Sequence, residues 1–122
     1  MNYRCITIAL FLVSLQGVPV CSGEDLSRLI ESALKRAGDN SVSLQKALED
    51  APQNQKEGIR FLIAYMPDHD VKSLSAEFLL NQIRFAYQAW NEAPWKDRIP
   101  KEIFLNDVLP YASINERRDD WR

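Results

Sequence analysis

The chain has 122 residues, with 15 Lys and Arg side chains against 17 Asp and Glu side chains and a formal net charge of −2. A chain of this length holds one domain with a modest core. The charges are mixed along the chain, without the basic patch that nucleic acid requires and without a polybasic membrane-binding surface. Nucleic acid and anionic lipid are therefore excluded as expected partners.

The N-terminal stretch has the layout of a secretory signal peptide. A single positive charge, Arg4, precedes the uncharged apolar run 5–15, and the small residues Ser22 and Gly23 suit cleavage. The run is shorter than the ~20 apolar residues that span a bilayer. We therefore expect residues 1–22 to be a signal peptide and the protein to be exported, that is, secreted, periplasmic or in the cell envelope. Its only expected membrane contact is through the signal before cleavage.

Cleavage would remove both cysteines, Cys5 and Cys21, and would change the net charge from −2 to −3 because Arg4 leaves with them. The expected mature segment, residues 23–122, has no disulfide and depends on packing for its stability. Two alternatives stay open for the N-terminal stretch. In the first, the stretch is not cleaved and forms a buried helix. In the second, Cys21 is the lipid-bearing cysteine of a lipoprotein, although Val20 directly before it fits a lipoprotein signal poorly.

The mature segment is expected to be all-α, with five or six short to medium helices, because apolar side chains recur at spacings of three and four. The first helix stops at Gly38, and a second begins with Ser41 or Ser43 as its cap. Pro52 is expected in the first turn of the third helix. Gly58 weakens that helix by about 1 kcal/mol relative to alanine, so close packing is its expected purpose.

Residues 68–72 are expected to form a polar connection to the longest helix, which covers about 75–91 and starts at Ser73 or Ser75. Only one narrow stripe of this helix is polar, so the helix is expected to be largely buried. Its apolar surface is larger than the other helices easily cover. This excess is the first indication of further partner structure.

A turn-rich loop follows, and then a short fifth helix that is expected to turn Ile103 and Phe104 inward. The expected sixth helix, 116–122, has Ser113 or Asn115 as its cap. No Gly, Pro or polar tail marks a natural end of this helix. We therefore expect the chain to be a piece of a longer protein.

His69, the only histidine, lies between Asp68 and Asp70 and is a candidate metal ligand or general base. Neighbouring residues of one loop rarely converge on one ion, however, and further ligands at regular spacing are missing. No serine has a nucleophile-elbow pattern, and the scattered glycines form no phosphate-binding loop. We expect no catalytic, cofactor or metal site in this segment.

Aromatic side chains near the C-terminal end and an adjacent charged cluster are expected to pack against further structure. The alternative is a sugar- or peptide-binding surface, since aromatic side chains anchor interfaces. The full set of candidate interdomain residues is Trp95, Tyr111, Arg117, Arg118, Asp119, Asp120 and Trp121.

Several stretches between residues 58 and 122 also carry a family resemblance. They are Phe-Leu-Ile-Ala-Tyr-Met-Pro at 61–67, Ser-Leu-Ser at 73–75, Phe-Leu-Leu at 78–80, the segments 99–100 and 103–111, and the charged run 115–122. Together they resemble the N-terminal helical region of bacterial exported transglutaminase-like proteins. In that family a papain-like core with a Cys-His-Asp triad follows this region, so the resemblance implies that the catalytic residues come after Arg122.

The sequence therefore predicts a non-catalytic helical region that packs on and positions a downstream core of the same protein. The resemblance leaves open whether that core is an acyltransferase, a cysteine protease or an inactive relative. The alternative, from a different class, is a stand-alone secreted helical binding module that uses surface aromatics.

Overall fold

A computed structural model describes residues 23–112 and 117–118 of the chain. Within those residues the regular structure is helical and contains no strand, so the all-α prediction is confirmed. In chain order the elements are α1 (Gly23–Ala37), η1 (Gly38–Asn40), α2 (Ser41–Asp50), η2 (Gln53–Gln55), α3 (Lys56–Tyr65), α4 (Asp68–Ser73), α5 (Ala76–Glu92), η3 (Lys96–Arg98), α6 (Lys101–Ile103) and η4 (Phe104–Val108).

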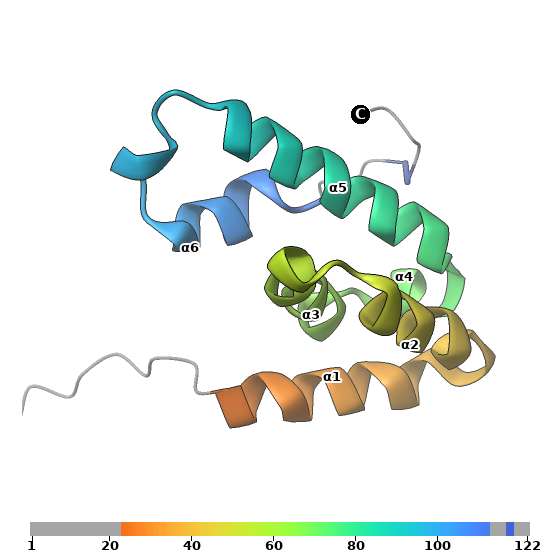
Figure 1. The fold of residues 1–122 in the computed structure, drawn as a ribbon. Helices are drawn as coiled ribbons and strands as arrows, with labels where there is room; N and C mark the ends of the chain where they lie inside the picture. The colour runs from red at the N-terminus through yellow and green to blue at the C-terminus, as the bar shows by residue number, and fades with distance from the viewer. Residues whose placement is uncertain (1–22, 113–116, 119–122) are drawn as a thin grey trace, which may run out of the picture.

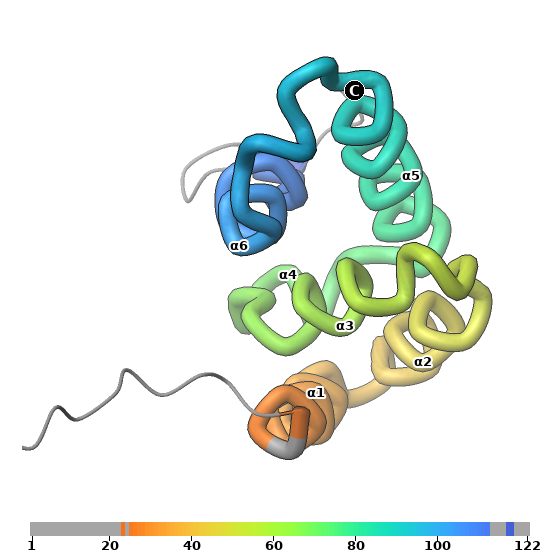
Figure 2. The backbone as a smooth tube through the Cα atoms, turned by 60° about the vertical axis from the view of Figure 1, so that its left-hand side comes forward, coloured from red at the N-terminus to blue at the C-terminus, as the bar shows by residue number. Residues whose placement is uncertain are grey.

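The helices are stacked in three tiers (Figure 1). Helix α1 forms one outer tier and packs against α3 and α4, which share the middle tier with α2. The long helix α5 forms the other outer tier, and the chain returns alongside it through α6 and η4 (Figure 2). None of the described helices is both long enough and apolar enough to cross a membrane.

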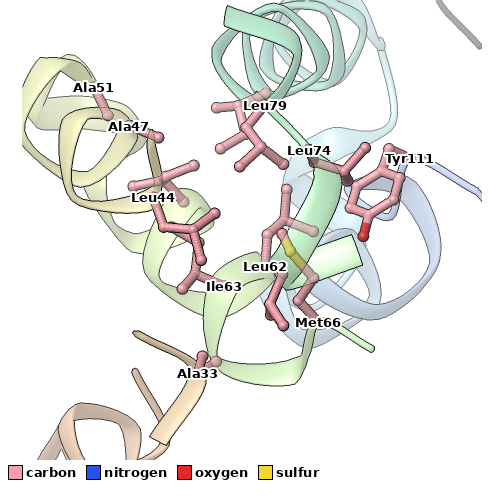
Figure 3. Close-up of a cluster of buried hydrophobic side chains, with 14 of the residues drawn as sticks. Ala33, Leu44, Ala47, Ala51, Leu62, Ile63, Met66, Leu74, Leu79 and Tyr111 are labelled. Carbon is pink, nitrogen blue, oxygen red and sulfur yellow. The ribbon is translucent and has the colours of Figure 1, made fainter. Parts of the chain in front are cut away.

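The core lies between the tiers and consists mainly of aliphatic side chains from α1 to α5, together with Phe104, Leu109 and Tyr111. Figure 3 shows Leu44, Leu62, Ile63 and Leu79 facing one another in this cluster, with Tyr111 beside Leu74 at its edge. Burial of large aliphatic side chains stabilises the folded state by roughly 1.5–3 kcal/mol each. The tiers are therefore held together mainly by this apolar contact.

The turn between α1 and α2 depends on Gly38, whose φ of +57° lies in the left-handed region that favours glycine. The predicted caps Ser41 and Ser43 are wrong, because α2 begins at Ser41 and Asn40 occupies the cap position without a side-chain cap bond. The Asn40 Nδ2 instead donates to the carbonyl oxygens of Val71 and Leu74, at 2.9 Å each. The side chain thus ties α2 to the end of α4.

The start of α3 differs from the prediction. Pro52 lies ahead of the 3-10 turn η2, with an extended ψ of 148°, and α3 begins only at Lys56. The Lys56 Nζ explains part of this arrangement, because it donates to the last carbonyls of α2 and so holds the turn against that helix. The close packing expected at Gly58 is confirmed, since a Cβ there would lie 2.8 Å from the Cε2 atom of Tyr87.

The segment predicted as a polar connection is the short helix α4. Pro67 precedes it with extended backbone, and Asp68 and Asp70 lie in its first turn, where carboxylates favour the positive end of the helix dipole. Asp70 and Val71 are buried in it. The prediction is wrong because Asp70 and Val71 within the helix and Leu74 at its C-terminal cap are all buried, a spacing that the acidic residues obscured.

Helix α5 confirms the long buried helix. Ser75 is its cap, since the Ser75 Oγ accepts a hydrogen bond of 3.1 Å from the Phe78 backbone N–H. One face is fully buried, and several of the remaining apolar side chains pack partly against the core. The buried side chains are Ala76, Leu79, Gln82, Ile83 and Ala86, and the partly buried ones include Phe78, Leu80, Tyr87 and Trp90.

The fifth predicted helix exists, but its inward face differs. After the single turn α6, the chain continues as the π-helix η4, in which the Leu109 N–H donates to the Phe104 carbonyl at 2.8 Å. The wider turn places Phe104 and Leu109 in the core and leaves Ile103 exposed, so the inward orientation predicted for Ile103 is wrong. Of the predicted sixth helix, the structure describes Arg117 and Arg118, and neither is helical.

Candidate functional site

Asp70 is the centre of the most unusual polar arrangement in the described part of the chain. This residue is 0% exposed, and among the described residues only Gln82 is also polar and buried. The Tyr111 hydroxyl donates to Asp70 Oδ2 at 2.8 Å. The Arg118 Nε lies 3.0 Å and 3.1 Å from the two carboxylate oxygens. The carboxylate thus joins α4 to Tyr111 and Arg118, two residues of the part of the chain after η4, called here the C-terminal stretch.

The chemistry of this cluster is that of a satisfied buried charge. A carboxylate taken out of water costs several kcal/mol unless a cation and hydrogen-bond donors replace the solvent. Arg118 supplies the cation and Tyr111 supplies a hydroxyl donor. Burial and the hydrogen bond to Asp70 both raise the pKa of Tyr111, burial being the larger cause, so that this hydroxyl keeps its proton.

The three side chains considered as a metal site point to different partners. Asp68 is 72% exposed and forms an ion pair with Arg36, whereas Asp70 faces the protein interior. His69 is exposed, with its Nδ1 3.3 Å from Asp70 Oδ1. Over residues 23–112 and 117–118, no group of three His, Cys, Asp or Glu side chains is placed to hold a metal ion.

A shallow, mainly apolar groove of about 210 Å³ lies next to Asp70. Phe61 and Tyr65 form one side, with ring centroids 4.8 Å apart, and Tyr65 is 51% exposed. Pro110 and Tyr111 also line it. The groove therefore lies where the C-terminal stretch meets α3 and α4.

The structure separates the residues that were predicted to act together. Tyr111 and Arg118 meet at Asp70, and Arg117 is exposed. Trp95 is not among the residues that line the groove beside Asp70; it is 39% exposed and packs edge-to-face on Trp90 with centroids 5.7 Å apart. The remaining predicted residues lie outside the described part of the chain: Asp119, Asp120 and Trp121.

Sequence reasoning missed Asp70 as the residue that brings this site together. The signal was present in the spacing of Asp70, Val71 and Leu74, which puts a carboxylate on the apolar face of a short helix. A charge in that position needs a cation, and apart from the adjacent exposed His69, whose Nδ1 lies 3.3 Å away, that cation comes from a distant part of the chain. The partner, Arg118, is 48 residues away.

The cluster holds segments together and does not present an activated nucleophile. Ser73 lies near His69, but its hydroxyl donates to the His69 backbone carbonyl at 2.8 Å and not to the imidazole. A hydroxyl nucleophile needs a base within hydrogen-bond reach of its proton. The geometry therefore favours a structural role.

No protein-family model matches the chain, and neither a curated protein nor a solved structure matches it. The fold and the site define a class in structural terms: a small three-tier helical assembly whose C-terminal stretch is held by a buried carboxylate.

Proposed function

We propose that this chain is a non-catalytic helical region that packs on and orients a downstream part of a longer exported protein. The observation that carries the proposal is the Asp70 cluster, which holds both Tyr111 and Arg118 against α4. The more specific proposal, that the downstream part is a transglutaminase-like core, rests on the sequence resemblance alone.

A buried ion pair is a weak source of net stability, because the cost of removing two charges from water offsets most of their attraction. Its contribution is geometric, since the charges are satisfied in only one arrangement. Asp70 connects one helix to points 41 and 48 residues further along the chain. The path of the polypeptide at residue 118 is thereby fixed relative to the helices, as a positioning region requires.

The coding sequence beyond Arg122 is the first test. We expect an open reading frame that encodes a further domain, with a cysteine, a histidine and an acidic residue as the triad. A stop codon directly after Arg122 would contradict the proposal of a longer protein. A further domain without these three residues would contradict only its transglutaminase-like part.

Hydrogen exchange tests the positioning role itself. The backbone amides of residues 109, 111, 112, 117 and 118 should be protected in the wild-type protein, and D70N should remove that protection. D68N is the matched control, because Asp68 is two residues away and its side chain is 72% exposed. Equal protection in D70N and wild-type protein would contradict the role given to Asp70.

A second candidate is a stand-alone helical binding module, favoured by the exposure of Tyr65 and Trp95. Thermal unfolding of purified residues 23–122 separates the two candidates. A monomer with a cooperative transition supports the module. Aggregation, or a molten state with exposed apolar surface, supports a region that needs its downstream partner.

A further inference from the structure

A second cavity, of about 360 Å³, lies at the other end of α5 from its Ser75 cap, and no described residue lines both it and the groove beside Asp70. It is bordered by the last turns of α5, by η3 and α6, and by Asn54 of η2. Its volume is within the lower range of small-molecule sites, which begins at about 300 Å³. The cavity plays no part in the function proposed above.

One wall of this cavity is aromatic and firmly supported. The Trp90 ring packs against Phe104 at 4.9 Å and edge-to-face on Trp95 at 5.7 Å. The Tyr87 ring packs edge-to-face on Phe104 at 4.8 Å and is seated against Gly58, where any side chain would displace it. Because neighbouring rings fix both side chains, the wall is formed before any ligand arrives.

The other walls are polar and carry an excess of positive charge. The lining includes the amides of Asn54 and Asn91, each of which both donates and accepts hydrogen bonds. It also includes Lys96 and Lys101, and none of its described lining residues carries a carboxylate. The lining thus combines a flat apolar face, amides that match hydroxyl groups, and the ammonium group of Lys96, which no carboxylate of the described residues contacts. Together these features select a hydroxylated ring that bears a negative charge.

The two lysines differ in their interaction partners. The Lys101 Nζ is paired with the carboxylate of Glu57, and the hydrogen bond to Glu57 raises the pKa of Lys101. Among the residues that the structure describes, the Lys96 Nζ makes one hydrogen bond, of 3.1 Å, to the neutral backbone carbonyl of Asn91. An ammonium has three donors. Lys96 is therefore the cation that the cavity offers to an anion.

We propose that this cavity binds an acidic monosaccharide. The ring lies on Trp90, the hydroxyl groups bond to the amides of Asn54 and Asn91, and the carboxylate or phosphate group is held by Lys96.

The test uses glucuronate, glucose 6-phosphate and glucose as probes of the purified chain. Binding is followed by the indole N–H signal of Trp90 in proton–nitrogen correlation spectra. We expect the two anions to shift this signal and glucose to bind at least about tenfold more weakly, as expected for loss of a charge-assisted hydrogen bond. The stronger of the two anions identifies the acidic group. A Trp90 signal that no anion shifts, or equal affinity for glucose and glucuronate, overturns the proposal.

K96M is the decisive variant, because methionine keeps an unbranched side chain of similar reach and removes the charge. It should lower the affinity for the preferred anion about tenfold and leave the weak glucose affinity unchanged. K72M is the matched control, since Lys72 is an exposed lysine of α4 outside the cavity. Wild-type affinity in K96M, or an equal loss in both variants, would show that Lys96 does not hold the ligand. Circular dichroism establishes that both variants are folded.

Discussion

Replacing Asp70 by asparagine tests the buried ion pair most directly. The substitution keeps the size of the side chain, removes its charge, and places an amide where Arg118 and Tyr111 both need an acceptor. Removal of one partner of a buried ion pair costs about 3–5 kcal/mol. The Arg118 side chain is 21% exposed and can turn toward water, which favours the lower end of that range. We therefore expect D70N to lower the free energy of unfolding by about 3 kcal/mol.

This loss is large for a chain of this size, because domains of about 100 residues are stable by roughly 5–15 kcal/mol. The assay is urea unfolding followed by circular dichroism at the helix band. With a urea dependence of about 1.5 kcal/mol per molar, the midpoint should fall by about 2 M. The control is D68N, which breaks the exposed ion pair with Arg36 and should cost less than about 1 kcal/mol. Equal losses in D70N and D68N would refute the reasoning.

Three further predictions concern other contacts. Y111F should lower the free energy of unfolding by about 1.5–3 kcal/mol at neutral pH, because a hydrogen bond to a charged acceptor is lost. Because folding raises the pKa of Tyr111, its protonated hydroxyl adds to the free energy of unfolding below the unfolded-state pKa of about 10, and this stabilisation is lost as pH rises above 10. Urea unfolding at pH 8 and pH 11 should therefore show a larger alkaline loss of stability in the wild-type protein than in Y111F. G58A should destabilise by about 1 kcal/mol or more despite the better helix propensity of alanine, because its Cβ meets the Tyr87 ring, whereas G23A, with nothing within 4 Å of the new atom, should not destabilise. S75A should cost about 1 kcal/mol by thermal unfolding, since the Phe78 N–H loses its cap, and an unchanged melting temperature would argue against that bond.

The parts of the fold that local spacing determines were predictable from the sequence. Gly38 ends the first helix through its backbone freedom, and Ser75 caps the long helix through a bond to a residue three positions away. The purpose of Gly58 was also evident, since a helix tolerates glycine poorly unless something packs against it. Each of these inferences depends on a few neighbouring residues.

The errors arose where a distant residue decides the structure. Asn40 bonds to the end of α4 and not to its own helix, and Asp70 is buried because Arg118 and Tyr111 reach it from over 40 residues away. The orientation of Ile103 depends on the π-helix that follows it, which no periodic pattern indicated. The candidate site was therefore predictable only in its two C-terminal members and not in the carboxylate that joins them.

The distance along the chain between Asp70 and Arg118 has a consequence for synthesis. Chains emerge from the ribosome at roughly 5–20 residues per second, N-terminal part first. Helix α4 is complete 45 residues before Arg118 is made, since it ends at Ser73. During that interval a buried Asp70 would lack its cation, so tight burial of α4 is unfavourable. Helix α4 and the residues that bond to Asp70, namely Tyr111 and Arg118, therefore reach their final packing together, only after residue 118 has left the ribosome.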